Sequence, residues 1–70
     1  MEHLINIQWD DEARVWYASC ESIPLVLESG SFDALIERIK IAAPEMIAEN
    51  GGSTGPVHLC FRSERHYVAN

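Results

Sequence analysis

The sequence has few cysteines and no long apolar run. Cys20 and Cys60 are its two cysteines, too few for the disulfide-rich class of small secreted proteins. Met1 is not followed by the basic and then apolar segments of a signal peptide. We therefore expect a cytoplasmic protein with reduced thiols. No apolar run approaches the ~20 residues that cross a bilayer, so the sequence predicts no membrane span.

Basic residues are also scarce. The chain has 5 Lys and Arg against 11 Asp and Glu, which gives a formal net charge of -6. In so small a protein this charge repels phosphate backbones, so we expect no direct binding of nucleic acid. The same charge suits a basic protein partner, because complementary fields speed association.

The sequence lacks the local motifs that announce a metal or catalytic site. Zinc sites place two ligands close together in sequence, because one local structure then fixes both. Ser19, Cys20 and His58 could serve nucleophilic catalysis, but no motif sets a base beside a nucleophile. The sequence therefore predicts no catalytic residue, no cofactor and no metal site. No paired spacing of the zinc type occurs among His3, Cys20, His58, Cys60 and His66.

The first third of the chain has the pattern of a β-hairpin. Residues 3–9 alternate apolar and polar, as in a half-buried strand. Residues 14–20 are rich in the β-branched and aromatic types that strands favour. The short polar link at 10–13 contains aspartates that can bond nearby backbone N–H groups. The sequence predicts two antiparallel strands joined at this link.

A third strand and a helix are predicted next. Residues 25–29 follow Pro24 and form a short strand, and Ser31 is suited to cap a helix over 32–49. Pro44 interrupts the helical pattern, so we expect a kink or a restart there. A glycine pair at 51–52 ends the helix. The apolar stripe that should face the sheet is Phe32, Leu35, Ile36, Ile39, Ala43, Met46 and Ile47.

A final strand completes the predicted fold. Residues 51–56 read as a connector, and 57–62 alternate as a strand, with an extension through Tyr67 and Val68 left open. The order β-β-β-α-β predicts one α+β domain over 1–70, a two-layer sandwich of a three-strand antiparallel meander, a C-terminal strand and one helix. A domain of 70 residues has a thin stability margin, so we expect a homodimer.

The hairpin contains most of the side chains that could take part in binding or catalysis. Clustered carboxylates can bind a divalent cation, but three consecutive acids in a turn do not converge their oxygens as a Ca²⁺ loop does. Aromatic residues beside them favour a protein contact surface, or burial of at least one tryptophan under the helix. A solvated turn is the plainer alternative. The candidate partner-contact residues are Trp9, Asp10, Asp11, Glu12 and Trp16.

The joint spacing of several short motifs resembles the HicB-like small-domain superfamily, and most closely its stand-alone subgroup, a domain of unknown function. The resemblance covers residues 3–52. Its hairpin motif is followed by an Ile-Pro turn at Ile23 and Pro24 and by a Pro-Glu-x-Ile helix end at 44–47. The hairpin motif itself consists of Trp9, Asp10, Glu12, Ala13, Val15, Trp16 and Ala18.

The resemblance implies a partly degraded RNase H-like fold, used in HicB antitoxins to cover a small basic RNA-cleaving toxin. We expect no segment of the DNA-binding type that often follows the domain in such antitoxins. We therefore expect a non-catalytic protein-binding module that resembles the antitoxin domain. The alternative is a metal-dependent nucleic-acid hydrolase that retains RNase H-like chemistry, with Asp10, Asp11 or Glu12 as ligands.

Overall fold

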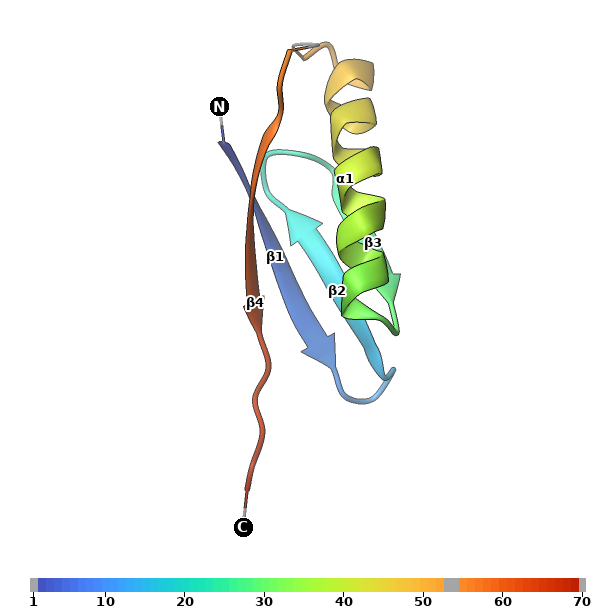
Figure 1. Cartoon of the computed structure of the whole chain (residues 1–70), viewed down its shortest axis with the longest axis vertical. Helices are drawn as coiled ribbons and strands as arrows, with labels where there is room; N and C mark the ends of the chain where they lie inside the picture. Colours follow the sequence, from blue (N-terminus) through green and yellow to red (C-terminus); the bar gives the residue numbers. More distant parts are fainter. Residues whose placement is uncertain (1, 53–54, 70) are drawn as a thin grey trace.

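The computed structural model describes residues 2–52 and 55–69 and contains one sheet and one helix in two layers (Figure 1). Positions 53 and 54 of the predicted connector lie outside the described residues. The sequence prediction of an α+β fold is confirmed. The elements in chain order are β1 Glu2–Asp10, β2 Val15–Cys20, β3 Leu25–Ser29, α1 Phe32–Glu49 and β4 His58–Glu64.

The sheet is mixed, with the strand order β3-β2-β1-β4. β1 pairs antiparallel with β2, and β2 pairs antiparallel with β3, as a meander requires. β4 returns beside β1 and runs parallel to it, with His3 opposite Leu59 and Ile5 opposite Phe61. A parallel return needs a long crossover, and α1 provides it. β4 and β3 are therefore the two edges of this sheet.

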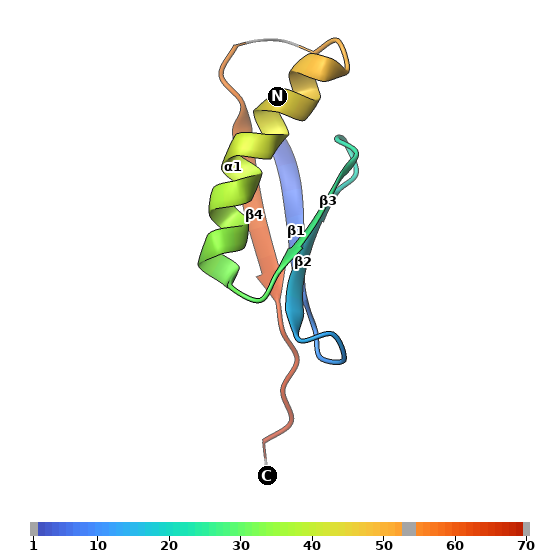
Figure 2. The same ribbon diagram turned by 90° about the vertical axis from the view of Figure 1, so that its right-hand side faces the viewer.

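The core lies between the sheet and α1, which covers one face (Figure 2). Ile5 and Ile7 on the central strand β1 are 0% and 1% exposed. The predicted apolar stripe of the helix, with residues three or four positions apart, faces the sheet, and its residues are buried or half-buried. The buried residues are Ile5, Ile7, Ala18, Ile23, Leu25, Leu35, Ile39 and Ala43.

Both ends of α1 are fixed by local signals that the sequence carries. Ser31 Oγ accepts from the Ala34 N–H at 3.3 Å, which satisfies one free donor of the first turn. At the other end, Gly51 adopts a φ of 78°. Gly52 N–H donates to the Ile47 carbonyl at 2.8 Å, and this bond closes a Schellman motif. A Cβ on Gly52 would lie 2.5 Å from Ile47 Cγ2, so a larger residue would force this turn apart.

α1 passes through Pro44 without a break. Of the two outcomes expected at Pro44, the restart is therefore wrong, and the helix changes direction along its length, as Figure 2 shows. Pro44 has no N–H for the carbonyl of Lys40, four residues earlier, and Lys40 lies on the exposed side of the helix where water can satisfy that carbonyl. Within the described residues, no helix is long and apolar enough to cross a membrane.

The boundaries of three strands differ from the predicted ones. β1 runs one residue further at each end, and β2 starts at Val15 because Arg14 has a φ of 59° that strands do not accept. β4 starts at His58, one residue later than predicted, and continues to Glu64 but not through Tyr67 and Val68. The chain after Glu64 runs past the end of the sheet (Figure 1), and the molecule is therefore 48 Å long.

The substitution Pro44→Ala tests whether the fold needs the bend in α1. Alanine supplies the N–H that Pro44 lacks, and an interior proline costs a helix about 3 kcal/mol. Because the helix is already continuous, we expect a gain of about 1 to 3 kcal/mol in the free energy of unfolding, measured by urea denaturation. Glu45→Ala, at an exposed neighbour, should change it by less than about 0.5 kcal/mol. A loss of several kcal/mol in Pro44→Ala would show that the bend is required.

Candidate functional site

An aromatic cluster lies on the helix side of the hairpin. Trp9 and Trp16 are direct cross-strand partners on β1 and β2. Their ring centroids are 5.2 Å apart at an interplanar angle of 61°, an edge-to-face contact. Trp16 also meets Phe32 of α1 at 5.1 Å and 77°. The prediction that a tryptophan packs under the helix is confirmed for Trp16, which is half-buried against the core.

Arg65 covers the open side of this cluster. Its guanidinium carbon lies 4.3 Å from the centroid of Trp9 and 5.8 Å from that of Trp16. A guanidinium over an indole face is attracted by the ring quadrupole. Arg65 follows β4 directly. It lies four residues after Phe61, and since side chains alternate between the two faces of a strand, Arg65 also points to the helix side. Sequence analysis missed this residue, because the alternation alone does not place β4 beside β1.

The acidic residues of the hairpin have separate roles. Asp10 Oδ1 accepts from the N–H groups of Glu12 and Ala13 at 3.1 and 3.2 Å, so this carboxylate holds the turn. Asp11 Oδ1 accepts from Trp9 Nε1 at 3.1 Å. Glu12 is exposed at the tip. The three acids therefore do not act as one cluster, and two of them shape the corner of the fold.

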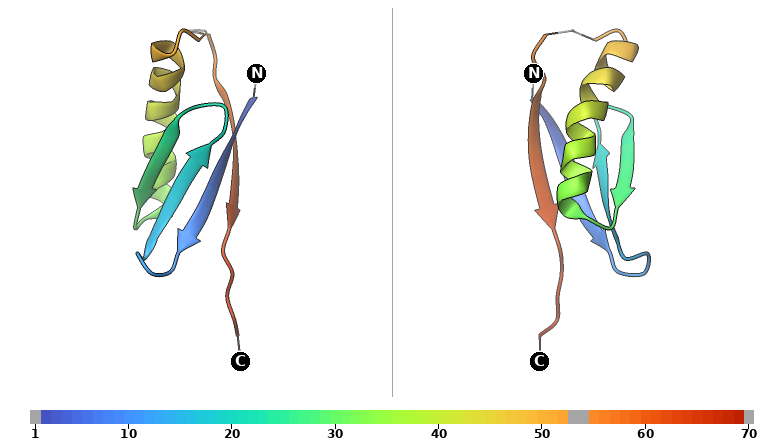
Figure 3. Two further views of the ribbon diagram at one scale, coloured as in Figure 1. Left: turned by 180° about the vertical axis from the view of Figure 1, so that it is seen from behind. Right: turned by 45° about the vertical axis from the view of Figure 1, so that its right-hand side comes forward.

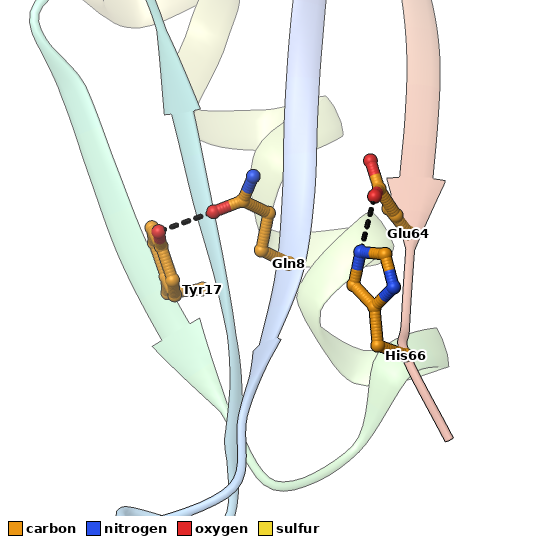
Figure 4. Close-up of polar contacts among 4 residues, drawn as sticks. All are labelled: Gln8, Tyr17, Glu64 and His66. Carbon is orange, nitrogen blue, oxygen red and sulfur yellow. Dashed lines mark hydrogen bonds and ion pairs between the residues drawn. The ribbon is translucent and has the colours of Figure 1, made fainter. Parts of the chain in front are cut away.

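A pocket of about 300 Å³ opens between the hairpin and the chain after β4. Glu64 Oε1 lies 2.5 Å from His66 Nε2, and Figure 4 shows this pair beside β4. The same figure shows Tyr17 donating its hydroxyl hydrogen to Gln8 Oε1, between β2 and β1. The pocket thus combines an indole face with two carboxylates. Its lining residues are Gln8, Trp9, Asp11, Glu64, Arg65 and His66.

A second pocket of about 290 Å³ lies near the end of α1 and the start of β1. At its edge, His3 Nδ1 is 2.7 Å from Ser22 Oγ, and Cys20 Sγ is 3.3 Å from the same hydroxyl. A serine nucleophile needs such a base, and the base needs a third group that orients it. The contacts shown for His3 include no third group, so this pair ties the β2–β3 turn to β1. The lining residues are His3, Ser22, Ile23, Pro24, Met46, Ile47, Asn50, Gly52, Pro56 and Val57.

The structure brings together part of the predicted contact surface. Trp9, Trp16 and Asp11 meet, whereas Asp10 turns into the hairpin loop and Glu12 stands apart. Over residues 2–52 and 55–69, no three His, Cys, Asp or Glu side chains are grouped as metal ligands are. The hydrolase alternative therefore gains no ligand set from Asp10, Asp11 or Glu12, and it stays a prediction.

Comparison with known proteins gives a family and a solved structure. The family described as "Domain of unknown function (DUF1902)" matches residues 2–69. The crystal structure of the hypothetical protein TTHA1013 from the extremely thermophilic bacterium Thermus thermophilus is similar, with a TM-score of 0.83 and 30% sequence identity over 99% of this chain and 100% of that chain. No curated protein sequence shows significant similarity to the chain.

Substitution of Asp10 separates a turn residue from a contact residue. Asp10→Ala removes the acceptor of two backbone N–H groups, and we expect it to lower the free energy of unfolding by about 1 kcal/mol. Asp10→Asn keeps an acceptor oxygen and should lose less than half of that. Glu12→Ala, at the exposed tip, is the control and should change stability by less than about 0.5 kcal/mol. Equal losses in all three variants, measured by urea denaturation, would contradict the assigned role of Asp10.

Proposed function

The chain belongs to the DUF1902 family, and we propose that it is a small, non-catalytic protein-binding module that takes a basic partner. The observation that carries the proposal is the position of Arg65, whose guanidinium lies over Trp9 in a pocket that Asp11 and Glu64 also line. The protein's own arginine thus indicates which chemistry this surface accepts. A basic side chain of a partner would use the same indole face and the same carboxylates.

The energetics favour a cation at this surface. A guanidinium on an exposed indole contributes about 0.5 to 1 kcal/mol, and nearby carboxylates add attraction that salt screens. Arg65 makes this contact from the chain that follows β4, outside any regular element. Because such a segment has little to hold it in place, the arginine of a partner can compete with Arg65 for Trp9.

The net charge supports the same partner class. At -6 the chain attracts basic proteins and repels nucleic-acid backbones, so the proposal includes no direct binding of DNA or RNA. The resemblance to HicB-like domains adds a more specific candidate, a small basic toxin-type protein that this module would cover as an antitoxin does. The reduced thiols of Cys20 and Cys60 fit a cytoplasmic setting for that encounter.

A short arginine-rich peptide tests the proposed surface. Both tryptophans of the chain belong to the aromatic cluster, so their fluorescence reports on the site directly. We expect the peptide to change this fluorescence in a saturable way, with an affinity that falls as salt is added. A signal that does not saturate, or an affinity that does not depend on salt, would contradict the proposal.

Two charge variants locate the binding site. Asp11→Asn keeps an acceptor for Trp9 but removes one charge from the pocket, and it should weaken peptide binding several-fold. Glu49→Gln removes the same charge from the exposed end of α1 and should have little effect. Arg65→Ala should tighten binding, because it vacates the face of Trp9. Equal effects of the Asp11 and Glu49 variants would show that only net charge matters.

A further inference from the structure

β4 is an edge strand of the sheet. It is seven residues long, pairs with β1 on one side and has no proline within it. Such an edge presents a row of backbone donors and acceptors that another strand can pair with. The opposite edge, β3, is less open to pairing. β3 has five residues, follows Pro24, and has the carbonyl of Glu28 occupied by Arg38 Nη1 at 3.0 Å.

The helix side of β4 is only partly covered, because Leu59 packs against the core whereas Phe61 does not. α1 lies over β3 and β2, and β4 runs beside the helix instead of under it (Figure 3, right). Phe61 points to the same side as Ile5, because the two residues are parallel partners, and it remains 36% exposed. A phenylalanine that is about a third exposed, in the middle of an edge strand, gives that edge an apolar centre.

We propose that β4 pairs antiparallel with β4 of a second copy, about a two-fold axis at Phe61. The two four-stranded sheets then become one continuous sheet with both helices on the same face. This contact does not require the basic partner proposed above, although the two share Glu64 and Arg65, which line the pocket beside Trp9. The thin stability margin of a 70-residue domain gives the pairing a physical benefit.

The side chains of β4 select this register. Centring the pair on Phe61 matches all seven residues, brings Phe61 against its own copy, and sets His58 opposite Glu64 twice. An imidazole donates an N–H to a carboxylate, so these are two complementary cross-strand contacts. Centring it on Cys60 would instead set His58 opposite Arg62, and centring it on Arg62 would bring two arginines together. A register in which one β4 slides by a single residue along the other is excluded, because residues that face each other across two strands must lie on the same face of the sheet.

The same register also brings the exposed residues after β4 beside the second copy. Beyond β4 it sets Arg65 of one copy opposite Val57 of the other, and Tyr67 opposite Gly55. Tyr67 and Val68 are each 83% exposed in the single chain. Val57 and Pro56 line the apolar pocket of about 290 Å³ near the end of α1, so the tyrosine of the second copy arrives beside that pocket.

Sedimentation equilibrium of the purified full chain, with charge variants, tests the pairing. We expect a reversible dimer for the natural sequence. Glu64→Lys should weaken it by about tenfold, since both His58 contacts are lost, and the double variant His58→Glu with Glu64→Lys should restore it. Because Glu64 also contacts His66, the control is His66→Ala, which should leave the dimer unchanged. A monomer at all concentrations, or a dimer that ignores Glu64→Lys, would overturn the proposal.

A cysteine variant tests the register itself without depending on affinity. Arg62→Cys places a thiol opposite the native Cys60 of the second copy, twice by symmetry. Mild oxidation should then give a covalent dimer that peptide mapping assigns to Cys60 joined to position 62. His58→Cys lies on the same face but opposite Glu64, and it should give no such link. Cross-linking of equal extent in both variants, or none in Arg62→Cys, would overturn the register.

Discussion

One helix cannot cover a sheet of four strands. A helix with its side chains is about 10 to 12 Å wide, whereas neighbouring strands lie about 4.7 to 4.9 Å apart, so four strands are broader than the helix. In this protein α1 lies over β3 and β2, with Leu35 and Ile39 fully buried in the core. Ile5 and Ile7 of β1 are also buried in this core, and Leu59 of β4 packs against it, but Phe61 of β4 remains 36% exposed on the helix side.

The two proposed contacts would each cover part of the surface that the helix leaves exposed. Beyond the end of β4, Arg65 lies over Trp9, a contact that a basic partner could replace. At the edge of the sheet, Phe61 remains partly exposed on β4, which has no neighbour on its outer side among the described residues. The face turned away from the helix is open as well (Figure 3, left), but it carries mainly polar residues. Binding is therefore expected where apolar surface and missing cover coincide.

Local signals were sufficient to predict most of the fold. The alternation around Ile5, the stripe along α1 and the cap at Ser31 each follow from residues close in sequence, and each is present. The contacts that were missed are those between distant segments. Arg65 reaches Trp9, and His3 reaches Ser22, because β4 and β1 are neighbours and because the β2–β3 turn lies beside β1. A periodicity cannot encode which strands become neighbours.

Amide hydrogen exchange of β4 at low and high protein concentration tests most directly whether the partly covered edge strand β4 is a binding edge. If β4 pairs with a second copy, exchange of its amides should slow as concentration rises, while exchange in β2, which already has neighbours on both sides, stays the same. Exchange of β4 that does not depend on concentration, from micromolar to millimolar protein, would contradict this account.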